Sequence, residues 1–191
     1  MFGRKKEISS DEQLMRQISN GDQEAFNALY ERYKDRLYYY FFRMLGNSEA
    51  MANDFIQDVF LKIIEKPGRF NPTYPFKTWV FSVAYNLCKN EYRRREIRKE
   101  APPSDNLIDL VNPVIPGNIS TEDLINRIFR SLDSLSPEHR SVFIMHYREG
   151  FPIKEIAGML ELAPGTVKSR LFYTRKYLAE KFQHLKGEIE F

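Results

Sequence analysis

A run of basic and hydroxyl-bearing residues near the C-terminus has the composition of a DNA-reading surface. Residues 165–181 contain five Lys or Arg residues and one Glu. Lysine and arginine side chains both contact DNA phosphates, and one well-placed arginine–guanine pair contributes about 1–3 kcal/mol of base discrimination. The residues expected to contact duplex DNA are Gly165, Thr166, Lys168, Ser169, Arg170, Tyr173, Arg175 and Lys176.

A helix-turn-helix is the element that would hold those residues in place. The sequence predicts a short helix over 152–161, a turn over 162–164 and a second helix over 165–182. Ala157 is small where the two helices would cross, and the second helix of such a motif enters the major groove. The apolar residues expected to join the helices are Ile153, Ile156, Leu160, Leu162, Val167 and Leu171. The alternative is an amphipathic hairpin with a solvated basic face. Ala163, at the expected N-cap, offers no side-chain acceptor.

A second cluster, over residues 69–95, combines aromatic and cationic side chains, as binding to unwound DNA requires. A base that leaves the stack costs a few kcal/mol, and aromatic stacking returns about 1–3 kcal/mol per base. We expect a proline-containing loop over 66–75 followed by a helix over 76–99, with Phe76 and Val80 in its core. The sequence does not decide whether Trp79 packs in the core or contacts DNA. The candidate residues are Phe70, Asn71, Tyr74, Lys77, Trp79, Tyr85, Asn86, Lys89, Asn90, Arg93 and Arg94.

A third surface lies on the helix expected over 48–65. Its apolar stripe comprises Phe55, Ile56, Val59, Phe60, Ile63 and Ile64. The opposite face surrounds one large apolar residue with polar ones, a pattern that suits a protein interface. A plain solvated face is the alternative. The candidate interface residues are Asp54, Gln57, Asp58, Leu61 and Lys62.

Helical spacing dominates the whole chain, so the sequence predicts an all-α protein of two small domains. An N-terminal helical bundle is expected over 11–100 and a helix-turn-helix domain over 121–184. The extended linker between them, 101–120, contains four of the ten prolines and no Lys or Arg. The net charge of +3 does not identify a partner by itself. A single cysteine, Cys88, and the lack of a signal peptide or apolar span predict a cytoplasmic protein.

The sequence contains no pattern that is typical of an enzyme active site. We find no Gly-rich phosphate loop and no nucleophile with a matched base. His139, His146 and His184 lack metal-ligand spacing with carboxylates or with Cys88. We therefore expect no catalytic residues, metal, cofactor or small-molecule substrate, and no direct insertion into a membrane.

Two long segments resemble the extracytoplasmic-function (ECF) sigma factors of the sigma-70 family. LSPEHRSVFIMHYREGFPIKEIAGMLELAPGTVKSRL resembles their region 4, while NDFIQDVFLKII followed by PFKTWVFSVAYNLCKNEYRRR resembles their region 2. The resemblance covers about residues 11–182 in the family's order. It implies that the face of helix 48–65 binds core RNA polymerase, that residues 66–95 recognise and melt the −10 element, and that the helix-turn-helix binds the −35 element. In the family, the loop matching 66–75 forms a pocket for a flipped −10 base. An anti-sigma factor is a further partner that the resemblance implies.

Two other functions stay open from the sequence. A stand-alone DNA-binding regulator would use the N-terminal helices for dimerisation or sensing, and would bind a palindromic operator tightly without polymerase. A helical adaptor that binds only proteins would tolerate Arg170→Ala and Lys168→Ala.

Overall fold

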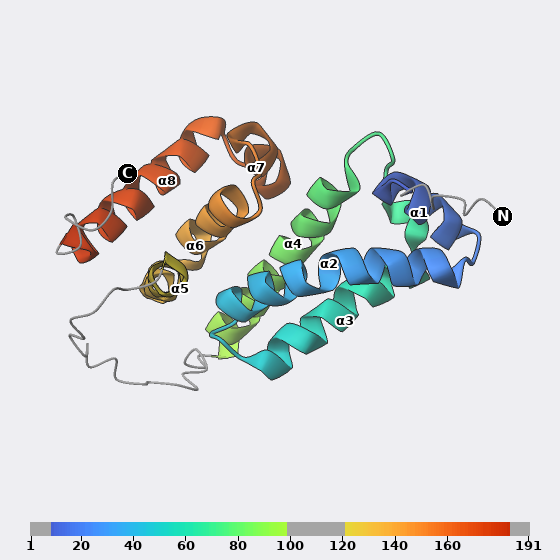
Figure 1. Ribbon diagram of the computed structural model, residues 1–191, viewed down its shortest axis with the longest axis horizontal. Helices are drawn as coiled ribbons and strands as arrows, with labels where there is room; N and C mark the ends of the chain where they lie inside the picture. Colours follow the sequence, from blue (N-terminus) through green and yellow to red (C-terminus); the bar gives the residue numbers. More distant parts are fainter. Residues whose placement is uncertain (1–8, 99–120, 184–191) are drawn as a thin grey trace.

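The computed structural model describes residues 9–98 and 121–183, and every regular element in these two ranges is a helix (Figure 1). This confirms the predicted all-α fold. The predicted linker, 101–120, lies outside the described residues. The first range holds α1 to α4, here called the N-terminal group, and the second holds α5 to α8, the C-terminal group.

The N-terminal group comprises α1 (Asp11–Ser19), α2 (Gln23–Met44), α3 (Glu49–Glu65), the short 3-10 turn η1 (Pro67–Arg69) and α4 (Phe76–Arg98). Local chemistry sets the starts of the first three helices. The side chains of Ser10, Asp22 and Ser48 each accept a hydrogen bond from a backbone N–H of the first turn. Gly46 and Asn47 separate α2 from α3 with positive φ angles.

The core of this group lies between α2, α3 and α4, with α1 packed on α2. Apolar residues at helical spacing face inward and are buried: Leu29, Leu37, Phe41, Ile56, Val59, Ile63, Phe76, Val80 and Phe81. Phe76 and Val80 are therefore core residues, as predicted. Ile64 is 53% exposed, so the predicted buried stripe on α3 is wrong at that position.

The C-terminal group comprises α5 (Thr121–Ser131), the 3-10 turn η2 (Leu132–Ser134), α6 (Pro137–Phe143), a π-helical continuation η3 (Ile144–Arg148), α7 (Ile153–Leu160) and α8 (Pro164–Lys181). The predicted helix-turn-helix is α7 and α8. Glu161 ends α7 in the left-handed conformation with φ 56°, and the Leu162 N–H returns to the Ala157 carbonyl over 2.9 Å. Ile156, Leu160, Val167 and Leu171 are buried between the helices.

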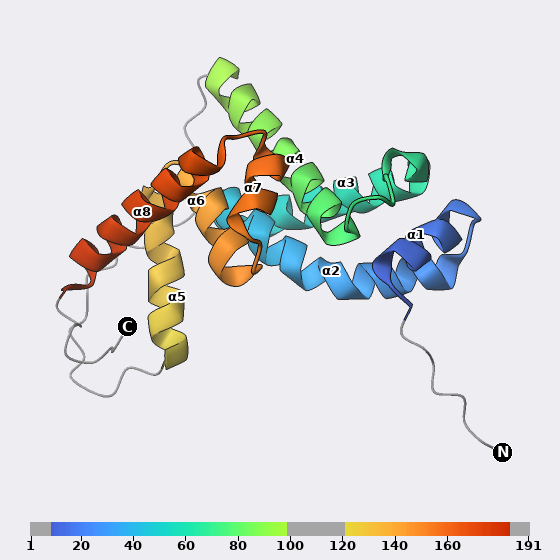
Figure 2. The ribbon, with the colours of Figure 1, turned by 90° about the horizontal axis from the view of Figure 1, so that it is seen from above.

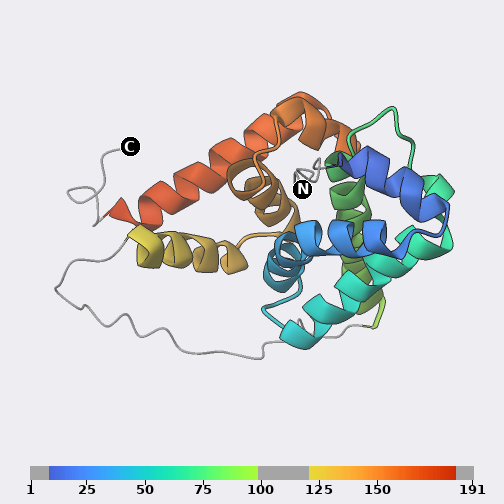
Figure 3. The ribbon, with the colours of Figure 1, turned by 45° about the vertical axis from the view of Figure 1, so that its right-hand side comes forward.

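The two groups pack against each other through α2 and α4 on one side and α6, η3 and α7 on the other (Figures 2 and 3). The Phe81 and Phe151 rings meet edge to face at 5.3 Å, and the Tyr40 and Ser141 hydroxyls lie 2.9 Å apart. Arg36 on α2 pairs with the buried carboxylate of Glu149 at 2.5 Å. The buried apolar residues of both groups consequently form one continuous cluster.

Arg140 on α6 fastens this junction. Its guanidinium is buried and donates to four backbone carbonyls, those of Arg43, Leu132, Asp133 and Leu135, over 2.8–3.2 Å. The first carbonyl belongs to α2 and the others to the chain just before α6. Helical periodicity gave no sign of this network, because an arginine on a short amphipathic helix ordinarily faces solvent.

Candidate nucleic-acid interface

Helix α8 presents most of the predicted duplex-binding residues to solvent. Lys168, Ser169, Tyr173, Arg175 and Lys176 are exposed, as is Gly165 at the helix start, while Thr166 is half-buried. Phe172 is 56% exposed beside Tyr173. It was missed among the candidates, although its position outside the Val167–Leu171 stripe is a signal that the sequence contains. The exposed residues form a cationic face with two adjacent aromatic rings.

Arg170 is placed differently from its basic neighbours on α8. It is half-buried, and its Nη1 atom is buried with no hydrogen-bond partner among the described residues. Burial lowers the pKa of His139, and the charge of Arg170 lowers it further. Burial acts to raise the pKa of Glu138, but hydrogen bonds to its own backbone and to Ser136, followed by the charge of Arg170, lower it. Arg170 therefore faces α6 in this arrangement.

The start of α8 lacks a side-chain cap, as expected. Ala163 is the N-cap, Pro164 follows at the first helical position, and the Thr166 N–H bonds to the Ala163 carbonyl at 2.9 Å. Proline lacks the backbone N–H that would otherwise be unpaired at this position, so the helix start has one fewer donor that needs a cap.

The loop before α4 has a buried beginning and an exposed tip. Phe70 is only 7% exposed, and its ring packs edge to face against Phe76 and Trp79, each at 5.5 Å. Trp79 is half-buried in the same cluster, so packing occupies much of the ring whose role the sequence left open. Asn71 and Tyr74 are exposed, and Tyr74 retains 62% of its surface. Of the loop aromatics, Tyr74 is the one whose ring is free to meet a base.

Several candidate residues on α4 face the C-terminal group. The Lys77 ammonium donates to the Glu149 carbonyl at 2.5 Å and lies 4.4 Å from the centre of the Phe151 ring. Burial lowers the pKa of Lys77. Asn86, Asn90 and Arg94 are exposed instead, and Arg94 pairs with Glu91 at 2.5 Å.

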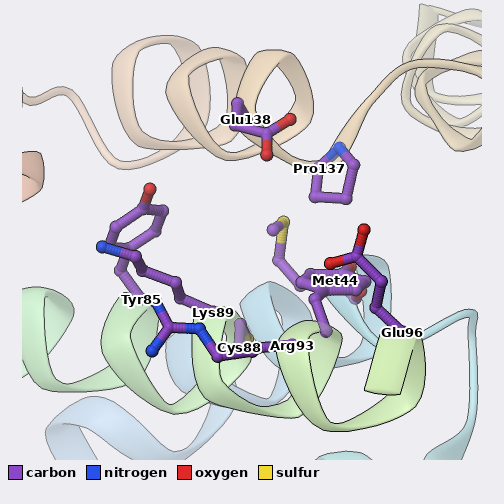
Figure 4. Close-up of a pocket in the computed structure, with 9 residues that line it drawn as sticks. Met44, Tyr85, Cys88, Lys89, Arg93, Glu96, Pro137 and Glu138 are labelled. Atoms are coloured by element: carbon purple, nitrogen blue, oxygen red, sulfur yellow. The ribbon is translucent and has the colours of Figure 1, made fainter. Parts of the chain in front are cut away.

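Further along α4, a cavity of about 200 Å³ separates this helix from the start of α6 (Figure 4). Tyr85, Lys89 and Arg93 line it from α4, opposite Glu138 and Pro137. The other lining residues are Met44, Cys88, Tyr92 and Glu96. The candidates for binding unwound DNA thus divide into a set at the loop tip and outer face of α4 and a set directed toward the C-terminal group.

Helix α3 carries the predicted protein-binding face. Asp54, Gln57 and Asp58 are exposed, Leu61 is 50% exposed, and Lys62 is half-buried. Ile64 lies one turn after Leu61 and is 53% exposed, so it extends the apolar part of the face. Two large apolar residues surrounded by carboxylates form a surface that can bury apolar area at a partner while the polar rim directs the fit.

Cys88 is buried on the side of α4 that lines the cavity between α4 and α6, and burial raises the pKa of its thiol. Because the reactive species is the thiolate, we expect alkylation of native Cys88 to be slower than that of a free thiol by at least about a hundredfold. The raised pKa keeps the native thiol protonated at neutral and mildly alkaline pH, and unfolding removes both the shift and the steric protection. Mass-spectrometric counting of alkylated Cys88 with and without denaturant checks this. Full labelling of the native protein at neutral pH is the contrary result.

The described residues contain no group of three or more His, Cys, Asp or Glu side chains that could hold a metal ion. Within the same part of the chain, no helix is both long and apolar enough to cross a membrane.

Comparison with known proteins gives the same two-part division. The family description "Sigma-70 region 2" matches residues 29–97, and "Sigma-70, region 4" matches residues 125–178. The ECF RNA polymerase sigma factor SigW of Bacillus subtilis is 26% identical over 181 residues, which cover 90% of this chain and 96% of SigW. The ECF RNA polymerase sigma-E factor of Escherichia coli K12 is 28% identical over 190 residues, covering 92% and 96%.

Solved structures agree with these matches. CnrH, in complex with the cytosolic domain of CnrY, superposes with a TM-score of 0.66 at 25% identity, covering 92% of this chain and 99% of that one. The fold is also that of the sigma factor RpoE from Bartonella quintana, solved with the anti-sigma factor NepR, with a TM-score of 0.63 at 22% identity over 84% and 98% of the two chains. The region 2 match contains α3 and α4, and the region 4 match contains the helix-turn-helix. The chain belongs to the sigma-70 family, among its extracytoplasmic-function sigma factors.

Proposed function

We propose that this protein is an alternative sigma factor that binds core RNA polymerase and directs it to promoters with −35 and −10 elements. The observation that carries the proposal is the presence of both matched regions, in order, each with an exposed surface of suitable chemistry. The surface of α3 is acidic and apolar, and that of α8 is cationic. The protein acts as an initiation factor without catalysing a reaction itself, and it acts in the cytoplasm, where polymerase and promoter DNA are found.

The α3 face binds the polymerase. Leu61 and Ile64 supply apolar contact area, while Asp54, Gln57 and Asp58 form the polar rim. Interfaces commonly concentrate their free energy in a few such buried anchors.

The exposed face of α8 binds the −35 element. Its cations contact the phosphates and base edges of the major groove. Replacing Lys168, an exposed residue near the start of α8, with alanine is expected to weaken binding of the holoenzyme to all promoters similarly. It should also reduce the slope of log affinity against log salt by about 1, since one fewer phosphate contact releases one fewer counterion. Filter binding at several salt concentrations measures both quantities. An unchanged slope contradicts a phosphate contact by Lys168.

The loop before α4 and the outer face of α4 bind the unwound −10 strand. Asn71 and Tyr74 at the loop tip and Asn86, Asn90 and Arg94 on the helix are exposed. The residues of α4 that face the C-terminal group, including Lys77, can join them only after the two groups separate.

An anti-sigma factor is a further proposed partner. Support comes from two superposed structures, each solved with a partner: CnrH with the cytosolic domain of CnrY, and the sigma factor RpoE with the anti-sigma factor NepR. A protein that covers the α3 face would exclude polymerase from this chain.

Run-off transcription with purified core polymerase tests the function. Adding the protein should produce transcripts with defined starts, and sequencing those starts in induced cells should reveal a shared −35/−10 pair. If the protein forms no stable complex with core polymerase and produces no promoter-selective transcript, the proposal is rejected. A gel shift without polymerase separates the alternatives, because tight binding to a palindromic site would identify a stand-alone regulator instead.

A further inference from the structure

Helix α4 begins without a side-chain cap from its own sequence neighbours. The residue before it is Pro75, and the first backbone N–H of the helix, that of Phe76, donates instead to Glu12 Oε1 at 3.0 Å. Glu12 lies 64 positions earlier, in the first turn of α1. The hydrogen bond from Phe76 is the main reason that the pKa of Glu12 is lowered. A carboxylate of α1 thus caps the helix proposed to melt DNA.

Helix α1 is itself held firmly enough to act as a support. A reciprocal capping box joins Ser10 and Gln13 and fixes its first turn. The adjacent carboxylate, Asp11, pairs with Arg32 at 2.6 Å and accepts a hydrogen bond from the Tyr33 hydroxyl. Leu14, Met15 and Ile18 bury the apolar side of α1. Two consecutive acidic residues therefore connect α1 to α2 and to the start of α4.

The loop that these contacts control is the exposed tip between Phe70 and Phe76. Packing of the Phe70 ring anchors its beginning, and the Glu12 hydrogen bond, together with the Tyr33–Phe76 ring contact at 5.1 Å, anchors its end. Between the anchors, the Asn71 side chain accepts from the Thr73 N–H at 3.0 Å, and the Asn71 carbonyl accepts from the Tyr74 N–H at 3.1 Å. The exposed Tyr74 ring is consequently presented by a loop with two fixed ends.

We propose that Glu12 is a positioning residue for −10 recognition. By holding the Phe76 N–H, it sets where the loop tip and its Tyr74 ring stand relative to the unwound strand, without touching DNA itself. This inference rests on the proposed function and deepens it. Glu12 lies before residues 29–97, the part matched to region 2. Small displacements of a positioning element are costly, because a misplacement of about 1 Å can reduce a rate a hundredfold.

The test uses the full chain, core RNA polymerase and a promoter fragment that the wild-type protein transcribes. Glu12→Ala is expected to lower open-complex formation about tenfold, because one charge-assisted hydrogen bond is lost. Glu12→Gln retains an acceptor oxygen and should stay within about twofold of wild type. Glu24→Ala, which removes an exposed carboxylate from the first turn of α2, is the matched control and should also stay within about twofold. Permanganate reactivity of unpaired thymines measures the open complex.

Replacing single non-template −10 bases by abasic sites distinguishes positioning from general destabilisation. At the base read by the loop, we expect the replacement to lower wild-type open complexes about tenfold, since stacking on that base is lost. The same replacement should lower the amount of open complex formed by the Glu12→Ala protein by less than about twofold, because this variant has already lost that contact. Core-polymerase affinity should be equal for the two proteins.

Two results would overturn the inference while leaving the proposed function intact. One is a Glu12→Ala protein in which each abasic replacement lowers open-complex formation by the same factor as in the wild type. The other is a loss of open complexes matched by an equal loss of core binding. If the wild-type protein forms no open complex on any promoter, the proposed function fails first and the inference fails with it.

Discussion

Replacing both Leu61 and Ile64 with aspartate is expected to weaken binding to core RNA polymerase by at least about a hundredfold. The two side chains are 50% and 53% exposed on one face of α3, so they contribute little to the core. In the proposed complex they are the apolar anchors of an otherwise polar face, and burying new carboxylates there is strongly unfavourable. Fluorescence anisotropy with labelled protein and purified core polymerase measures the affinity.

Ile97→Asp provides the control for that experiment. Ile97 is 76% exposed at the far end of α4, so the substitution replaces an exposed apolar residue by one carboxylate, half the charge added in the double variant, without touching the α3 face. The free energy of unfolding of each variant should differ from that of the wild type by no more than about 0.5 kcal/mol per substitution, as is usual for surface changes. A double variant that is folded and binds polymerase as tightly as wild type would remove α3 from the proposed interface.

Arg140→Ala is expected to lower the free energy of unfolding by about 3 kcal/mol or more. The substitution removes the donor of four backbone carbonyl oxygens, two of them in buried hydrogen bonds, and each buried unpaired group costs about 1–3 kcal/mol. Arg140→Lys should recover only part of the loss, because a compact ammonium cannot reach acceptors arranged around a planar guanidinium. Urea denaturation followed by circular dichroism gives the values.

Arg175→Ala, on the exposed face of α8, is the matched control for Arg140 and should change stability by less than about 0.5 kcal/mol. Equal effects at both positions would show that the carbonyl network contributes nothing beyond the loss of a charged side chain.

The fold class and the helix-turn-helix followed from the sequence because both depend on short-range patterns. Apolar residues three and four positions apart define one face of a helix, and the turn predicted over 162–164 places the start of the last helix within one residue of where α8 begins, at Pro164. The cationic character of α8 follows from the same short segment. Such information is contained within one or two turns of the chain.

Residues whose surroundings come from distant segments were harder to predict. Phe70 was a candidate for DNA contact because it is an aromatic residue in a loop, yet Phe76 and Trp79 enclose it. Ile64 lies at the edge of the α3 stripe, where a small rotation decides whether a side chain is buried. Long-range contacts are equally hidden from the sequence. The most distant hydrogen-bond partner lies 64 positions away for Glu12, 97 positions away for Arg140 and 113 positions away for Glu149. Periodicity identifies a helical face, but it does not identify what covers that face.

The contact between α4 and the C-terminal group has a thermodynamic consequence for promoter affinity. In this arrangement Lys77 donates to the Glu149 carbonyl and lies against the Phe151 ring, so for the proposed −10 contact only molecules in which the junction is open present Lys77 to DNA. Observed affinity falls in proportion to the fraction that is open, and an open fraction of about 1% weakens it about a hundredfold. A ligand that favours the separated arrangement restores that factor, so the enzyme that receives the two domains would strengthen their hold on DNA before making any contact with DNA itself.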